Sequence, residues 1–249
     1  MAPFLLLSLI LQVACGVHVV RTGRPLYWLF ILLLFSYIAV LIYFIAEILP
    51  ELRNNPAARR AARRARAHVD PGRERRQGER QLGLADTVEN RRLLAEQCLQ
   101  EGDFARAEEL FSASLKGLYR TDPDLMLGLA RAQHGQGKPQ AARDTLDALI
   151  AANPGFRSID GHLLYARAVE DLGDTAAALH EYETVVQGYP GEEARARYAL
   201  LLRRSGDTEA ARRLFQEILD RADLQQSHYR RAQKEWIALA RSELASLRG

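Results

Sequence analysis

The sequence predicts an all-α protein in which two apolar helices precede a solenoid of helical hairpins. Three observations lead to this fold class. A spaced pattern of large, small and turn residues recurs four times between Leu94 and Ile218. Two apolar segments near the N-terminus are each long enough to cross a bilayer as a helix. A basic stretch separates these segments from the repeats.

Each repeat begins with a large residue followed by alanine, a pair that occurs as Leu94-Ala95, Leu129-Ala130, Tyr165-Ala166 and Tyr198-Ala199. A glycine follows seven residues after this alanine, a second alanine five residues later, and an aromatic residue or leucine four residues further on. These positions are Gly102, Gly137, Gly173 and Gly206, then Ala107, Ala142, Ala178 and Ala211, then Phe111, Leu146, Tyr182 and Phe215. The glycines lie 35, 36 and 33 residues apart, which is the period of a helical-hairpin repeat.

Packing explains these residue types. The first alanine lies where the two helices of a hairpin cross, because only a small side chain lets the backbones approach. The glycine ends the first helix in a left-handed conformation that other residues adopt at a higher cost. The second alanine is the matching small contact on the second helix, and the large residue after it fills the adjoining space. Pro154 and Pro190 then end the second helix in two of the repeats.

This pattern resembles the tetratricopeptide repeat family over residues 88–222. The resemblance implies a domain of four hairpins within residues 86–223, at about 88–121, 123–156, 159–191 and 192–223. The first repeat departs from the pattern by a four-residue extension around Tyr119–Pro123, and the fourth has Asp223 where a proline is usual.

Residues 1–50 predict a transmembrane hairpin with spans at about 2–20 and 26–49, joined by the short turn 21–25. His18, Trp28 and Tyr43 have a spacing that resembles the phospholipase D N-terminal segment, a membrane hairpin that precedes catalytic domains in cardiolipin-synthase-like proteins. No Lys or Arg precedes the first apolar run, which argues against a cleaved signal peptide. Lipidation at Cys15 is the weaker alternative, because Gln12 stands where a lipoprotein box has leucine.

Residues 51–85 predict a basic linker, since they contain ten arginines and four acidic residues. The arginines are Arg53, Arg59, Arg60, Arg63, Arg64, Arg66, Arg73, Arg75, Arg76 and Arg80. By the positive-inside rule this charge places both termini and the repeats on the cytoplasmic side of a bacterial inner membrane. The linker either binds anionic lipid headgroups or serves as a topology signal and spacer, with residues 57–67 as a short helix on the membrane. We expect no nucleic-acid binding, because no aromatic residues are interleaved for base stacking.

The sequence predicts no enzymatic activity, no cofactor and no metal site. His180-Glu181 begins like a zinc-protease helix motif, but Thr184 occupies the position of the second ligand. Gly135–Lys138 resembles a phosphate-binding loop only in part, because Ala132 and Pro139 replace the glycine and the hydroxyl residue that such a loop requires. The two cysteines, Cys15 and Cys98, lie in different parts of the chain and are expected to remain thiols in a reducing compartment.

A solenoid of this kind has a concave wall built from the first helix of each repeat. The candidate partner-binding residues on this wall are Leu127, Arg131, His134, Leu163, Arg167, Glu170, Leu200 and Arg203. Arg131 and Arg167 occupy equivalent positions in neighbouring repeats, and Leu127 and Leu163 are expected beneath them as an apolar floor. Such a surface suits an extended or helical peptide that carries carboxylates. The alternative is that Arg131 pairs with an acidic residue of the chain itself, such as Asp124 or Glu170.

Residues 225–247 predict one amphipathic helix that caps the solenoid within residues 224–249, with Trp236 in the core.

The whole sequence therefore predicts a membrane-anchored adaptor that binds a protein or peptide partner, with anionic lipids as a further partner of the linker. One alternative is a regulator of envelope lipid or lipopolysaccharide synthesis, although such proteins end in a Cys-x-x-Cys metal knuckle and no cysteine follows Cys98 here. A second alternative is an enzyme that acts on phospholipid headgroups. Such enzymes carry a His-x-Lys signature, and this chain has none.

Overall fold

The computed structural model describes residues 13–21, 25, 28, 42, 46–47, 56, 70 and 72–247. Most of the two predicted spans, 2–20 and 26–49, and all of the predicted linker helix 57–67 lie outside these residues. Among the described residues, no helix combines the length and the apolar character needed to cross a membrane. The chain divides into two compact units, Met1–Arg73 and Glu74–Gly249. In the first unit, residues 13–21 are helical.

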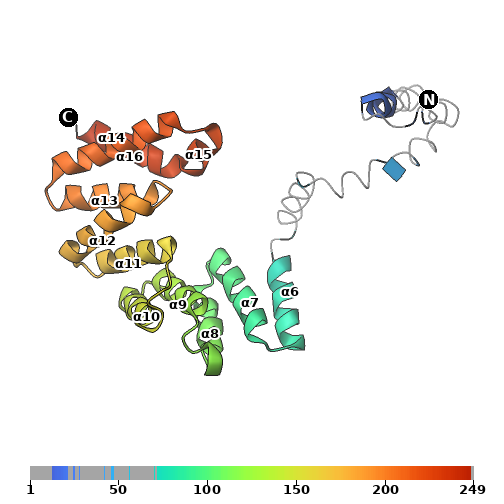
Figure 1. Cartoon of the computed structure of the whole chain (residues 1–249), viewed down its shortest axis with the longest axis horizontal. Coiled ribbons are helices and arrows are strands. Elements are labelled where there is room, and N and C mark those ends of the chain that lie inside the picture. The colour runs from blue at the N-terminus through green and yellow to red at the C-terminus, as the bar shows by residue number, and fades with distance from the viewer. Residues whose placement is uncertain are drawn as a thin grey trace. The chain divides into compact units, whose positions relative to one another are not determined.

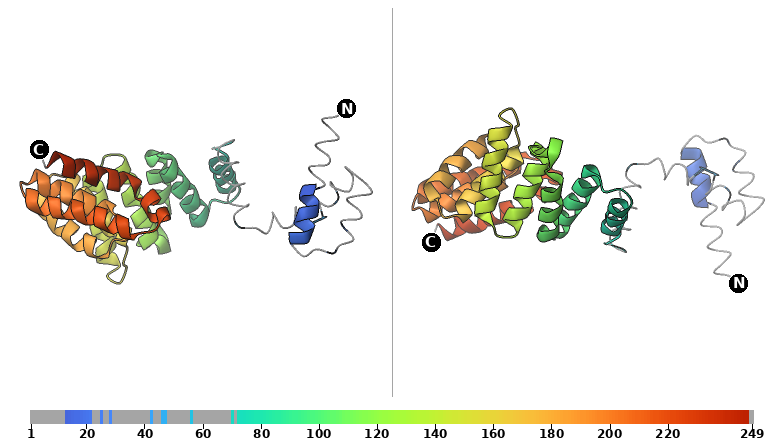
Figure 2. Two further views of the ribbon diagram at one scale, coloured as in Figure 1. Left: turned by 90° about the horizontal axis from the view of Figure 1, so that it is seen from above. Right: turned by 90° about the horizontal axis from the view of Figure 1, so that it is seen from below.

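The second unit is built from helices that follow one another in space in chain order, as Figures 1 and 2 show. Consecutive helices pack as four antiparallel hairpins, α7/α8, α9/α10, α11/α12 and α13/α14. The elements are α6 (Arg73–Leu84), α7 (Val88–Glu101), α8 (Phe104–Ser114), the 3₁₀ helix η2 (Gly117–Tyr119), α9 (Pro123–Gly135), α10 (Pro139–Ala152), α11 (Ile159–Asp171), α12 (Thr175–Gly188), α13 (Glu193–Arg204), α14 (Thr208–Leu224), α15 (Ser227–Ala232) and α16 (Lys234–Ser246).

The repeat alanines are fully buried between the helices of this unit. All eight have no exposed surface, on the first helices at Ala95, Ala130, Ala166 and Ala199 and on the second helices at Ala107, Ala142, Ala178 and Ala211. The large residues that follow on the second helices, Phe111, Leu146, Tyr182 and Phe215, are at most 3% exposed. The predicted crossing points of the four hairpins are therefore confirmed.

The turn glycines adopt the predicted left-handed conformation, with φ of 79°, 70°, 80° and 97° at Gly102, Gly137, Gly173 and Gly206. After Gly102, Gly137 and Gly206, the next residue donates its backbone N–H to a carbonyl five residues earlier, as Asp103 does to Cys98 at 2.9 Å. In three repeats that next residue is an aspartate whose carboxylate also caps the second helix: Asp103, Asp174 and Asp207. In these repeats a Gly-Asp pair thus ends one helix and begins the next. The capping aspartate also marks the start of the second helix, although the repeat pattern used to predict the hairpins did not include it.

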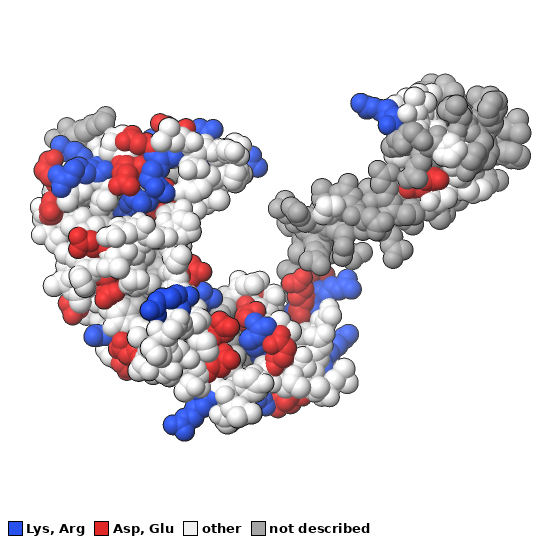
Figure 3. Space-filling model, viewed as in Figure 1, with Lys and Arg blue, Asp and Glu red and all other residues white. Residues whose placement is uncertain are grey.

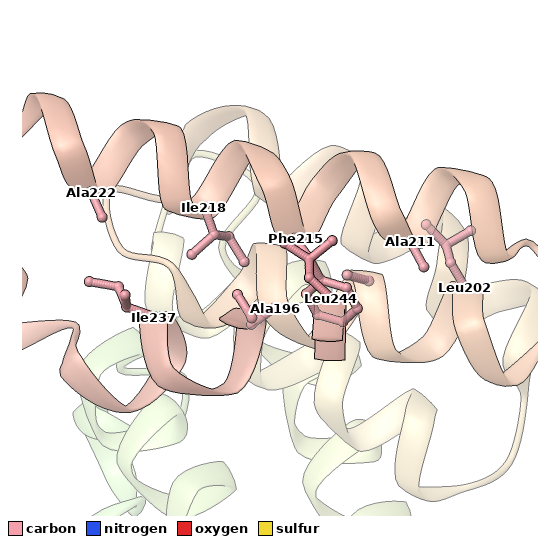
Figure 4. Close-up of a cluster of buried hydrophobic side chains, with 10 residues drawn as sticks. Ala196, Leu202, Ala211, Phe215, Ile218, Ala222, Ile237 and Leu244 are labelled. Carbon is pink, nitrogen blue, oxygen red and sulfur yellow. The ribbon is translucent and has the colours of Figure 1, made fainter. Parts of the chain in front are cut away.

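The hydrophobic core is a series of local clusters between neighbouring helices. In the last cluster, shown in Figure 4, Phe215 and Ile218 of α14 pack against Ile237 and Leu244 of α16, with Ala196 of α13 beside them. The helix α16 therefore covers the end of the solenoid, as expected of a cap.

The structure differs from the sequence prediction in three places. The predicted single helix 225–247 is wrong, because the backbone leaves helical geometry at Gln233 and separates α15 from α16. The extension in the first repeat does not lengthen α8, which ends at Ser114, but forms the turn between the 3₁₀ helix η2 and α9. The end of the predicted linker belongs to the repeat unit, because Arg75 of α6 pairs with Asp103 at 2.7 Å.

Candidate functional site on the inner helices

The first helices of the repeats, α7, α9, α11 and α13, carry the predicted concave-wall residues. An acidic residue lies in the first turn of each of these helices, thirteen residues before the turn glycine: Glu89, Asp124, Asp160 and Glu193. A negative charge is favourable there because the N-terminal end of a helix has exposed N–H groups. The acidic row is visible in the sequence, where the inward-face spacing includes Asp124 and Asp160, and the other two acids of the row occupy equivalent positions.

The predicted arginines face this acidic row. Arg131 Nη2 lies 3.7 Å from Asp160 Oδ2, and Arg167 Nη1 lies 3.6 Å from Glu193 Oε1. In both cases the acid belongs to the next repeat, so the ion pairs run along the solenoid. Arg131 therefore pairs with an acidic residue of the chain itself, as the alternative interpretation of the sequence expects. The acid is Asp160 rather than Asp124 or Glu170.

Arg203 and Glu170 extend the charged surface. Arg203 pairs with Glu243 of the cap helix α16. Glu170 pairs with Arg204 and accepts a hydrogen bond from the Tyr182 hydroxyl at 2.6 Å. Burial, together with the Glu170 carboxylate, raises the pKa of Tyr182 far above its usual range. Figure 3 shows blue and red side chains interspersed over this unit, so opposite charges lie close together.

The predicted apolar floor is absent from the surface. Leu127 is 7% and Leu163 4% exposed, because each packs into a core cluster between helices. Leu127 packs with Leu146 and Leu149 of α10. Leu200 is only partly buried, at the edge of the last cluster. Leu127 and Leu163 therefore form no open apolar floor beneath the arginines, since their side chains pack between helices, and Leu127 also contributes to the lining of a pocket between α10 and α11.

His134 is less exposed than the two arginines of the predicted groove. Its side chain is 11% exposed, and its Nε2 lies 2.9 Å from Asp171 Oδ2, outside hydrogen-bonding geometry. Burial lowers the pKa of His134, and the nearby Arg167 lowers this pKa further, while Asp171 opposes both effects. His134 is thus expected to be neutral at physiological pH.

The wall continues into the cap through Glu193, Arg197 and Trp236. Arg197 Nε donates to Glu193 Oε1 at 2.8 Å, so this carboxylate is shared by Arg167 and Arg197. The Arg197 guanidinium lies 5.4 Å from the centroid of the Trp236 ring, a distance typical of a cation–π contact. Trp236 is partly buried against the last core cluster, in agreement with its predicted core position.

A concavity lies between α10 and α11. It has a volume of about 370 Å³ and is lined mainly by apolar side chains, among them Leu146, Ile150 and Phe156. His162 Nε2 lies 2.9 Å from Glu181 Oε2 at its edge. No sequence pattern indicates this pocket, because it depends on how the 153–158 loop folds. Among the described residues no cluster of potential metal ligands occurs.

The comparisons with known proteins agree on the fold. Family models of the tetratricopeptide repeat match residues 99–168 and 163–225. The crystal structure of MamA is 21% identical, with a TM-score of 0.53, over 64% of this chain and 93% of that chain. A thermophilic tetratricopeptide protein of Thermus thermophilus is 18% identical, with a TM-score of 0.53, over 69% of this chain and 89% of that chain.

A tetratricopeptide protein of Parabacteroides merdae is 23% identical, with a TM-score of 0.50, over 66% of this chain and 61% of that chain. No curated protein sequence matches the chain. At these identities the solved structures show the fold alone, and this fold suggests a scaffold for protein–protein interaction. The repeat alanines, the turn glycines and the matching family models together show that residues 99–225 of this chain are tetratricopeptide repeats.

Proposed function

We propose that this chain is a non-enzymatic adaptor that binds an acidic protein or peptide segment along α9, α11 and α13. The observation that carries the proposal is the loose pairing of the two equivalent arginines. At 3.7 and 3.6 Å, the Arg131–Asp160 and Arg167–Glu193 pairs are longer than hydrogen bonds. The Arg131 and Arg167 side chains are also 44% and 33% exposed.

Breaking the two internal ion pairs so that the arginines can bind a ligand would cost little free energy. An exposed ion pair contributes about 0–1 kcal/mol to stability, because water screens it and both side chains lose freedom. A ligand carboxylate that meets a guanidinium in bidentate geometry makes two short charge-assisted bonds instead. The partner's carboxylates would replace Asp160 and Glu193 as the nearest acids. Without an exposed apolar floor, this binding should be polar and sensitive to salt.

The test is to neutralise the two arginines and to measure partner affinity. Arg131→Gln with Arg167→Gln should lower affinity by about a hundredfold, since each charge-assisted contact is worth about 1.5–3 kcal/mol. A matched control is Arg106→Gln with Arg143→Gln, because these arginines lie on the second helices α8 and α10 and pair with Glu109 and Asp147 of their own helices. If both double variants bind the partner equally well, the inner helices are a structural wall and the proposal fails.

We also propose that residues 2–20 and 26–49 anchor this adaptor in a bacterial inner membrane with the repeats in the cytoplasm. The length of the two apolar runs and the ten arginines of residues 51–85 support this arrangement. The same arginines would then lie near anionic headgroups, where each contributes about 1 kcal/mol. Recovery of the protein in the membrane fraction after an alkaline carbonate wash tests the anchor, and release into the supernatant would contradict it.

A further inference from the structure

Another concavity, lined by several charged side chains, lies at the end of the solenoid between the C-terminal part of α14 and the cap helices α15 and α16. We call it the cap pocket. Its volume is about 540 Å³, and Leu219 and Ile237 contribute to its apolar lining. Three cationic side chains also line it, those of Arg230, Lys234 and Arg241, together with the carboxylate of Asp223.

Among the described residues, the three cations of the cap pocket have no acidic partner, whereas several nearby arginines do. Arg203, Arg212 and Arg221 each pair with a carboxylate, namely Glu243, Glu209 and Glu192. By contrast, no ion pair or side-chain hydrogen bond joins Arg230, Lys234 or Arg241 to another residue in the part of the chain that the structure describes. Asp223 is the one carboxylate that shares the pocket lining with them. The pocket therefore carries unbalanced positive charge.

A buried cluster holds this surface in place. The Glu192 side chain has no exposed surface and accepts hydrogen bonds from Arg195 at 2.7 Å and from the Tyr229 hydroxyl at 2.6 Å. The Glu192 backbone N–H donates to Gln233 Oε1 at 2.9 Å. Because Tyr229 and Gln233 come directly before Arg230 and Lys234 in the chain, their contacts fix the backbone that carries these two cations. The charges are thus presented by an ordered segment, which lowers the entropy cost of binding.

We propose that the cap pocket binds an acidic peptide segment of a protein partner, independently of the inner-helix site. One apolar side chain of the peptide would lie against Leu219 and Ile237, and its carboxylates would pair with Arg230, Lys234 and Arg241. The Asp223 carboxylate would face a backbone N–H or a hydroxyl of the peptide. This mixture of one acid, three cations and an apolar lining suits a peptide, which can present carboxylates, donors and an apolar group at different points.

The experiment uses the full chain in a neutral detergent and two pools of short fluorescent peptides. Each peptide has leucine at its centre, flanked in one pool by Asp, Glu, Ser and Gly, and in the other by Lys and Arg in place of the acids. The protein carries Arg131→Gln and Arg167→Gln throughout, so that failure of the cap pocket is distinguishable from failure of the inner-helix site. We expect retention of the acidic pool, weakened by salt.

The deciding variant is Arg230→Gln with Lys234→Gln and Arg241→Gln, which should lower affinity for the retained peptides by about a thousandfold or more. Since these three residues are exposed, the circular-dichroism spectrum should stay unchanged. The control is Arg213→Gln with Arg231→Gln, which removes exposed cations of α14 and α15 that do not line the pocket. The control should bind as the parent does.

Three results would overturn the proposal. The triple variant and the control could bind the acidic pool equally well, the basic pool could be retained as strongly as the acidic one, or no peptide could be retained at all. A parallel arm uses vesicles of phosphatidylcholine with and without phosphatidylglycerol. If the triple variant loses vesicle binding while the parent retains no peptide, the cap pocket contacts anionic lipid and the peptide assignment is wrong.

Discussion

At the scale of single residues, Ala166 shows how tightly the hairpins are packed. It has no exposed surface and lies at the crossing of α11 and α12. Ala166→Leu should lower the free energy of unfolding by about 1–3 kcal/mol, because the larger side chain forces the helices apart. Ala151→Leu on the exposed face of α10 is the control and should change stability little. Chemical denaturation measures both, and equal midpoints would mean that the repeat register is wrong.

His134 should make stability depend on pH. Its pKa in the folded protein is lowered by burial and by Arg167, so between this value and the unfolded value of about 6.5 the unfolded chain binds more protons. Stability must therefore fall as the pH falls through this window.

The melting temperature of the parent should drop as the pH falls below about 6.5, and His134→Gln should reduce this drop. His180→Gln, an exposed histidine on α12, is the control and should melt with the pH dependence of the parent. A parent whose stability rises on acidification would show that Asp171 outweighs burial and Arg167.

Residue patterns predicted the fold better than they predicted the site. The alanines and glycines at the repeat positions could be predicted, because each serves a local role in a helix contact or a turn and recurs at a fixed spacing in the sequence. By contrast, the close approach of α8 and α9 at Gly128 could not be predicted. A Cβ atom on Gly128 would lie 2.4 Å from the Phe111 ring, and the other repeats have no glycine at the equivalent position. The burial of Leu127 and Leu163 also depends on the neighbouring repeat, so the wall position alone could not reveal it.

At the scale of elements, the junction of α13, α14 and α15 depends on Glu192. Glu192→Ala should lower the free energy of unfolding by about 2–4 kcal/mol, because it leaves Arg195, which is 6% exposed, without its buried partner. The loss is smaller than for a fully isolated charge, since Arg195 also pairs with Glu217 at 3.0 Å. Glu209→Ala, which breaks the exposed pair with Arg212, should cost little in the same denaturation experiment.

The helices themselves were largely predictable, and their breaks were not. Turn glycines and prolines bound the helices of the repeats, because these residues act through their own backbone geometry. The break at Gln233 instead depends on a contact between distant segments, in which the Gln233 side chain accepts the Glu192 backbone N–H. The position of α6 is similar, since Arg75 reaches Glu101 and Asp103 across the first repeat. The helical periodicity of residues 225–247 does not indicate the contact between Gln233 and Glu192.

At the scale of the whole molecule, the distribution of charge predicts the topology. Ten arginines follow the second apolar run, against two in the turn between the runs, so the repeats should face the cytoplasm. Alkaline phosphatase fused after residue 85 should be inactive, and a fluorescent protein fused there should fluoresce. The opposite pattern would place the repeats in the periplasm and would contradict the thiol state expected for Cys98.

The central claim is that the inner helices contact a partner, and site-specific photocrosslinking tests it most directly. A photoreactive benzoylphenylalanine replaces either Asp124, exposed on α9 in the acidic row, or Asp144, exposed on α10, so each variant loses one carboxylate. The account predicts a crosslinked protein partner from position 124 that disappears with Arg131→Gln and Arg167→Gln. A partner that crosslinks equally from position 144, or from position 124 regardless of the two arginines, would contradict it.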